Sequence, residues 1–109
     1  MKKKPEIFIA HILESIDWIE TYAKKMSFGQ FKKSTKDQDA IIRRFEIIGE
    51  AAKNLPVDFK QKHKNVAWNK IVGMRDVLIH NYFGVDLELV WKTIHEDLPS
   101  LKQSLKNLI

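Results

Sequence analysis

Apolar residues recur every three or four positions along most of the 109-residue chain, and this spacing constrains its fold most strongly. Such recurrence places apolar side chains on one face of an α-helix, whereas a half-buried strand requires strict alternation. No stretch alternates for long, and only four glycines and three prolines interrupt the pattern. The sequence therefore predicts an all-α fold, an antiparallel bundle of four to five helices joined by short loops.

The first two predicted helices are the longest, from about Pro5 to Lys25 and from about Asp37 to Asn54, where Thr35 or Asp37 supplies the cap. The first carries one apolar stripe, formed by Ile9, Ile12, Leu13, Ile16, Ile19 and Ala23. The second is apolar on nearly all sides, so it is central to the fold or lies in a subunit interface. Gly49 within it indicates close helix packing, because glycine costs about 1 kcal/mol relative to alanine in a helix.

The segment between these helices, residues 26–36, is predicted to be a linker, and five lysines without an acid occur from Lys24 to Lys36. Either this is a solvated loop or it faces phosphate groups, whose charge lysines neutralise. Together with a second basic segment, residues 60–70, it supplies the candidate contacts to such phosphate groups: Lys24, Lys25, Lys32, Lys33, Lys36, Lys62, Lys64 and Lys70.

The second half of the chain is predicted to hold shorter helices. One or two helical turns are expected within residues 57–67, a third long helix from Trp68 to Asn81, and a fourth from Asp86 to Asp97. Pro99 is expected to begin a last, separate helix. The residues of the fourth helix predicted to face inward are Leu89, Val90, Ile94 and Leu98.

Composition narrows the class of protein. The chain has no cysteine, which excludes a disulfide scaffold, a thiolate zinc site and a cysteine nucleophile. No apolar run reaches the roughly 18–20 residues of a membrane-spanning helix, and acids interrupt the segment after the basic N-terminus. We therefore expect a single cytoplasmic domain over residues 1–109. Its net charge of +5 suits an acidic partner such as nucleic acid.

The segment from Met74 to Tyr82 carries the candidate chemistry. Arg75 lies within an apolar helical stripe, and a guanidinium there needs an acid, carbonyl groups or a bound phosphate. A structural explanation is pairing with Glu46, Glu50 or an acid of another helix. His80 follows five residues later, about 140° away on an ideal helix. The two reach one phosphate only if the helix unwinds near His80 or if two copies meet across a two-fold axis.

Together these two residues suit a nuclease that needs no metal. Histidine titrates near neutral pH, so His80 can take a proton from a ribose 2′-OH or give one to the leaving oxygen. Arg75 can bind the scissile phosphate through two hydrogen bonds. The structural alternative for His80 is a helix-terminal histidine favoured by the helix dipole. The four histidines form no recognised metal-ligand spacing, so neither a metal nor a cofactor is expected.

The spacing Arg75, four residues, His80, one residue, Tyr82 resembles the signature of the HepT-like family within the HEPN superfamily. Three further segments resemble that family in order: residues 45–53 with their Ile-Gly-Glu-Ala sequence, residues 67–75, and residues 86–98. The resemblance implies a dimerising helical bundle and a metal-independent ribonuclease that is the toxin of a toxin–antitoxin pair. Arg75 and His80 would be catalytic, and Asp76 and Asn81 would support them. Many relatives have asparagine at the position of Asp76, so its role is open.

The resemblance also implies a partner. In the family, an MntA-like nucleotidyltransferase antitoxin silences the toxin by transferring AMP to the motif tyrosine, here Tyr82, and larger hetero-oligomers are expected. It further suggests that Gly49 packs closely within a dimer. Two other functions stay open: a non-catalytic nucleotide- or substrate-binding subunit of a nucleotidyltransferase complex, and a helical dimerisation protein with a structural motif.

Overall fold

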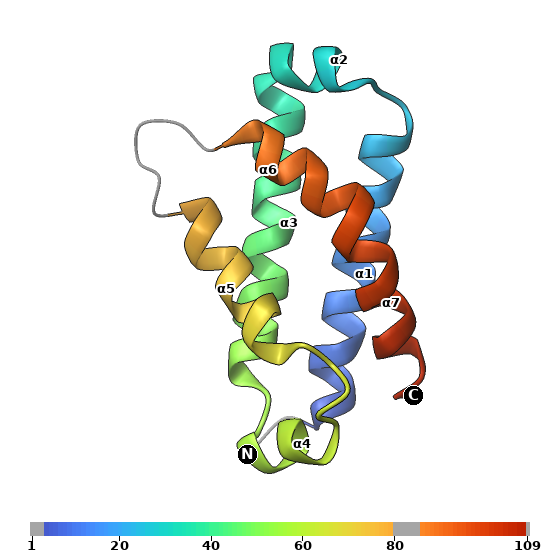
Figure 1. The fold of residues 1–109 in the computed structure, drawn as a ribbon, viewed down its shortest axis with the longest axis vertical. Coiled ribbons are helices and arrows are strands. Elements are labelled where there is room, and N and C mark those ends of the chain that lie inside the picture. Colours follow the sequence, from blue (N-terminus) through green and yellow to red (C-terminus); the bar gives the residue numbers. More distant parts are fainter. Residues whose placement is uncertain (1–3, 80–85, 109) are drawn as a thin grey trace.

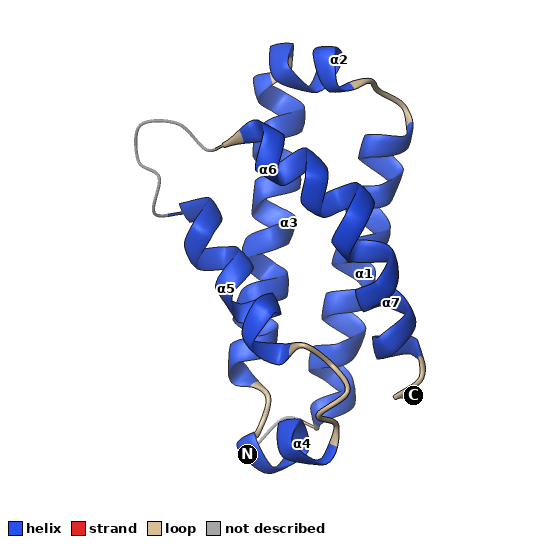
Figure 2. Cartoon of the chain, viewed as in Figure 1, coloured by secondary structure: helices blue, strands red, loops and turns tan. Residues whose placement is uncertain are grey.

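The computed structural model describes residues 4–79 and 86–108, and every regular element within them is helical (Figure 2). Two long helices, α1 (Pro5–Lys24) and α3 (Thr35–Asn54), run antiparallel and side by side along the long axis (Figure 1). Their bounds lie within two residues of the prediction. The predicted all-α bundle is therefore confirmed.

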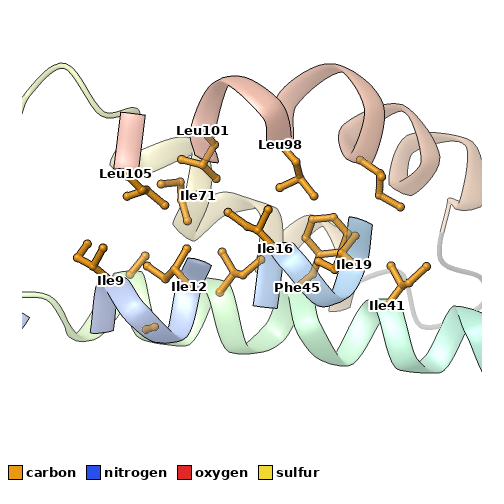
Figure 3. Close-up of a cluster of buried hydrophobic side chains, with 14 of the residues drawn as sticks. Ile9, Ile12, Ile16, Ile19, Ile41, Phe45, Ile71, Leu98, Leu101 and Leu105 are labelled. Carbon is orange, nitrogen blue, oxygen red and sulfur yellow. The ribbon is translucent and has the colours of Figure 1, made fainter. Parts of the chain in front are cut away.

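The core lies between these two helices and the C-terminal helical run. The apolar stripe of α1 is buried except for Leu13, which is partly exposed, and it faces Ile41 and Phe45 of α3 (Figure 3). Leu98, Leu101 and Leu105 close the core from the opposite side. Burial of this kind contributes about 1.5–3 kcal/mol for each large apolar side chain.

The segment predicted to be a linker contains a short helix, α2 (Phe28–Lys33), so that prediction was wrong. Ser27 and Gln30 form a reciprocal capping box at its start, which outweighs the effect of Gly29. The buried Phe31 ring stacks on Trp91, with 5.2 Å between ring centroids. The cap of α3 is also corrected: Ser34 accepts the hydrogen bond from the Asp37 N–H, and neither Thr35 nor Asp37 is the cap.

The next helices lie where the sequence placed them. Helix α4 (Val57–Lys62) is the short basic turn, and α5 (Trp68–Ile79) packs along α3 on the side away from α1 (Figure 1). Residues 80–85 lie outside the described residues, as does the predicted end of this helix at Asn81.

The C-terminal region differs from the two separate helices predicted. Helix α6 (Leu87–Lys92), the π-helical segment η1 (Thr93–Asp97) and α7 (Leu98–Lys106) form one continuous run. The Leu98 N–H bonds to the Thr93 carbonyl, and this wide turn lies just before Pro99, which has no N–H to continue an α-helix. Leu89 is 36% exposed, so the prediction that it faces inward was wrong.

Among the described helices, none combines the length and apolarity that crossing a lipid bilayer requires.

Candidate functional site

Arg75 lies where α5 packs against Gly49 of α3. A Cβ atom added at Gly49 would lie 2.5 Å from the Arg75 Cβ and 3.3 Å from its Cδ. Because a Cβ cannot rotate away, any larger residue at position 49 would push the two helices apart. Close helix packing is thus confirmed as the reason for Gly49, and this contact lies within one chain, not between the copies of a dimer.

The Arg75 side chain runs over Gly49 and ends beside Glu50. Its Nη1 lies 3.4 Å from the Glu50 Oε2, which confirms Glu50 among the acids expected to pair with it. The side chains are 35% and 54% exposed. An exposed pair of this kind contributes only about 0–1 kcal/mol. The pair therefore adds little to the stability of the fold, and the other N–H groups of the guanidinium remain able to bind a phosphate.

Arg75 and Glu50 line a surface groove of about 510 Å³ between α1, α3 and α5. Its other polar side chains are His11, Arg43, Glu46 and Asn54. Arg43 pairs with Glu46 within α3 at 3.3 Å, as neighbours one helical turn apart commonly do. Sequence reasoning associated Glu46 with Arg75 only as a possible ion-pair partner, and it did not associate His11, Arg43 or Asn54 with Arg75. The available signal for the α3 residues was their spacing, because positions 43, 46 and 54 share one face of the helix with Glu50.

The remaining motif residues lie beyond what the structure describes. His80, Asn81 and Tyr82 fall within residues 80–85, and the side chain of Asp76 is likewise outside the described residues. Whether His80 reaches the phosphate site of Arg75 therefore stays a prediction.

All eight lysines proposed as RNA contacts are exposed. They form two groups at opposite ends of the long axis: one around α2, and one from α4 to the start of α5 (Figure 1). The second group includes Lys70, whose Nζ lies 3.1 Å from the Asp97 Oδ1 and is thereby partly neutralised. A single chain thus does not bring the two groups to one groove.

Other clusters in the described part of the chain are structural. Within residues 4–79 and 86–108, no three histidine, aspartate or glutamate side chains gather closely enough to hold a metal ion. His63 and His95 pack against Phe59 and Trp91, with 4.7 Å and 4.6 Å between ring centroids. His11 is the described histidine that is exposed and lines the Arg75 groove.

Comparison with known proteins decides the family. Residues 12–108 match the model of the family described as ribonuclease HepT-like. The chain belongs to this family. A protein of Thermococcus cleftensis named a probable ribonuclease HepT is 45% identical over 99% of this chain and 98% of its own length.

Two further proteins are similar to this chain. A protein of Caldanaerobacter subterraneus named as a candidate RNase is 42% identical over 98% of this chain and 96% of its own length. A protein of Methanocaldococcus jannaschii, named a gamma-glutamylcyclotransferase and candidate RNase, is 47% identical over the whole chain, which spans only 49% of that relative. No solved structure matches the chain. The prediction of a HepT-like ribonuclease is confirmed at the level of the family.

Proposed function

We propose that this HepT-like chain is a metal-independent endoribonuclease toxin, with RNA, including tRNA, as its substrate. The proposal rests on one observation, the exposure and the ion pairing of the Arg75 side chain. Its side chain lines a surface groove, is 35% exposed, and pairs at 3.4 Å with Glu50, the acidic partner found among the described residues. A guanidinium held in this way can bind a phosphate through the N–H groups that Glu50 does not engage.

The proposed reaction uses the 2′-OH of the substrate as the nucleophile. His80 takes the 2′-OH proton, the oxygen attacks the adjacent phosphorus, and the bond from phosphorus to the 5′-oxygen breaks. The leaving oxygen takes a proton, so the products carry a 2′,3′-cyclic phosphate and a 5′-hydroxyl. Arg75 offsets the charge that develops on the phosphate oxygens.

A dimer would complete this site. Arg75 and His80 diverge on an ideal helix, so two copies meeting near residues 75–82 would place the arginine of one beside the histidine of the other. A second histidine would also be available to protonate the leaving oxygen. Two copies would in addition bring four lysine groups around the substrate, which a single chain does not.

The proposed regulation acts on Tyr82. An MntA-like nucleotidyltransferase antitoxin would transfer AMP to its hydroxyl, two residues after His80. The added phosphate would compete with RNA for Arg75 and repel the substrate backbone. Co-expression with such a partner should add AMP to Tyr82, and mass spectrometry that finds the adduct on Tyr22 or finds none would contradict this step.

The experiment that tests the reaction is cleavage of total RNA in EDTA. The wild-type chain should cut RNA, whereas Arg75→Ala and His80→Ala should each lose about 10²–10³-fold in rate, the usual cost of removing one such group. His95→Ala is the matched control, since His95 is exposed and does not line the Arg75 groove. Equal cleavage by His80→Ala and wild type would remove the acid–base role. No cleavage by any of them, with Tyr82 free of AMP, would favour the non-catalytic binding subunit.

A further inference from the structure

Two arginine–glutamate pairs line the same groove, and they are held differently. Arg43 pairs with Glu46 at 3.3 Å within α3, and its side chain is 69% exposed. Arg75 pairs with Glu50 at 3.4 Å between α5 and α3, and its side chain is 35% exposed. Arg75 is the more confined arginine, although the two ion-pair distances are nearly equal.

The confinement of Arg75 has two sources. Its aliphatic stem lies against the bare backbone of Gly49, because its Cβ, Cγ and Cδ would all lie within 3.4 Å of a Cβ placed there. Its guanidinium end then meets the carboxylate of the next residue, Glu50. Gly49 and Glu50 thus form a cradle: one residue makes room for the stem, and the other holds the charged end.

We propose that Glu50 is a positioning residue that holds the Arg75 guanidinium in the orientation needed to bind the scissile phosphate. The inference rests on the proposed ribonuclease function. A free arginine side chain samples many rotamers, and rate enhancement depends on groups fixed before the reaction begins. A misplacement of about 1 Å can lower a rate by about 10²-fold. Glu50 reduces this loss without touching the substrate.

The geometry of the pair is compatible with phosphate binding. The ion pair joins Nη1 to the Glu50 Oε2 at 3.4 Å, which is longer than a good N–H···O hydrogen bond. A bidentate pair with Glu50 would occupy the N–H donors of Arg75 that a phosphate needs. Because Glu50 is 54% exposed, water also screens its negative charge from an approaching phosphate.

The test compares Glu50→Gln with Glu46→Gln in RNA cleavage. Both variants remove one carboxylate from the same face of α3, but only the first removes the partner of Arg75. We expect Glu50→Gln to lower kcat by about tenfold with KM within about twofold, which marks a loss in the transition state. Glu50→Asp should restore part of kcat. Glu46→Gln removes the same charge from the groove and should change KM as Glu50→Gln does, but it should keep kcat within about twofold of wild type.

A second measurement tests directly whether Glu50 holds the Arg75 side chain, and it does not depend on RNA cleavage. The ¹⁵N NMR order parameter of the Arg75 Nε–H should fall in Glu50→Gln and stay unchanged in Glu46→Gln. An unchanged order parameter would overturn the proposal whether or not the chain cuts RNA.

The kinetic outcomes separate the remaining explanations. If Glu50→Gln and Glu46→Gln have the same kcat, Glu50 does not position Arg75. If Glu50→Gln lowers KM and leaves kcat unchanged, Glu50 only competes with the phosphate, which also overturns the proposal. A wild-type chain that cuts no RNA would instead refute the ribonuclease function, while the order parameter would still decide whether Glu50 holds Arg75.

Discussion

Helix α3 packs against α1 on one side and α5 on the other, and the two contacts are built from different residues. Toward α1 it presents fully buried apolar side chains such as Ile41 and Phe45 (Figure 3). Toward α5 it presents Gly49, with Glu50 beside it facing Arg75 across an open groove. One side of the same helix therefore stabilises the bundle, whereas the other leaves charged groups accessible to a ligand.

The largest expected effect comes from a substitution on the side of α3 that packs against α1. Phe45→Ala should lower the free energy of unfolding by about 3–5 kcal/mol, because it removes a fully buried ring and leaves a cavity. Unfolding in urea measures this loss. A loss below about 1.5 kcal/mol would show that the α1–α3 contact does not dominate stability.

The next effect tests how tightly α5 packs on α3. Gly49→Ala should lower stability, since forcing an atom into a packed contact costs about 1–3 kcal/mol and exceeds the gain in helix propensity. Gly73→Ala in α5 is the control: apart from its own stretch of helix, no atom of the described residues lies within 4 Å of its added Cβ, so it should gain about 0.5–1 kcal/mol. Thermal unfolding should show shifts of opposite sign, and shifts of the same sign would contradict the close approach at Gly49.

The smallest expected effect concerns an ion-pair cluster between α7 and α1. Lys102 donates a hydrogen bond to Glu20 at 2.8 Å and pairs with Asp17 at 3.1 Å, and these contacts raise its pKa. The raised pKa means that the stabilisation is complete below the ordinary lysine pKa of about 10.4 and is lost as the pH rises through the folded value.

This effect is measured as the difference in unfolding free energy between wild type and Lys102→Met. The difference should be below about 1 kcal/mol, because the pair is partly exposed, and constant from about pH 7 to pH 9. It should shrink above about pH 10.4. A difference that grows with pH would have the wrong sign for a lysine with a raised pKa.

The sequence predicted those parts of the fold that depend on repeated apolar spacing. Helices α1 and α3 have long stripes with clear ends, so their bounds were predicted within two residues. The errors lie where a local contact overrides the pattern. Ser27 and Gln30 stabilise a six-residue helix in the predicted linker, and a π-turn before Pro99 keeps α6 and α7 in one run.

The candidate site was predicted in part. The pattern alone identified Arg75 as a charged residue in an apolar stripe and named Glu50 among its possible partners, and the structure confirms the pair. It could not predict that the arginine stem lies on Gly49, since that depends on how α5 approaches α3. The roles of His80 and Tyr82 rest on the motif and stay predictions.

End-group analysis of the cleaved RNA, carried out in EDTA, tests the proposed chemistry most directly. Attack by the 2′-OH with Arg75 and His80 as the only catalytic groups predicts fragments that end in a 2′,3′-cyclic phosphate and begin with a 5′-hydroxyl. A substrate with a single 2′-deoxy nucleotide at the cleavage position should not be cut there. Fragments with a 3′-hydroxyl and a 5′-phosphate, or cleavage at the 2′-deoxy position, would contradict it.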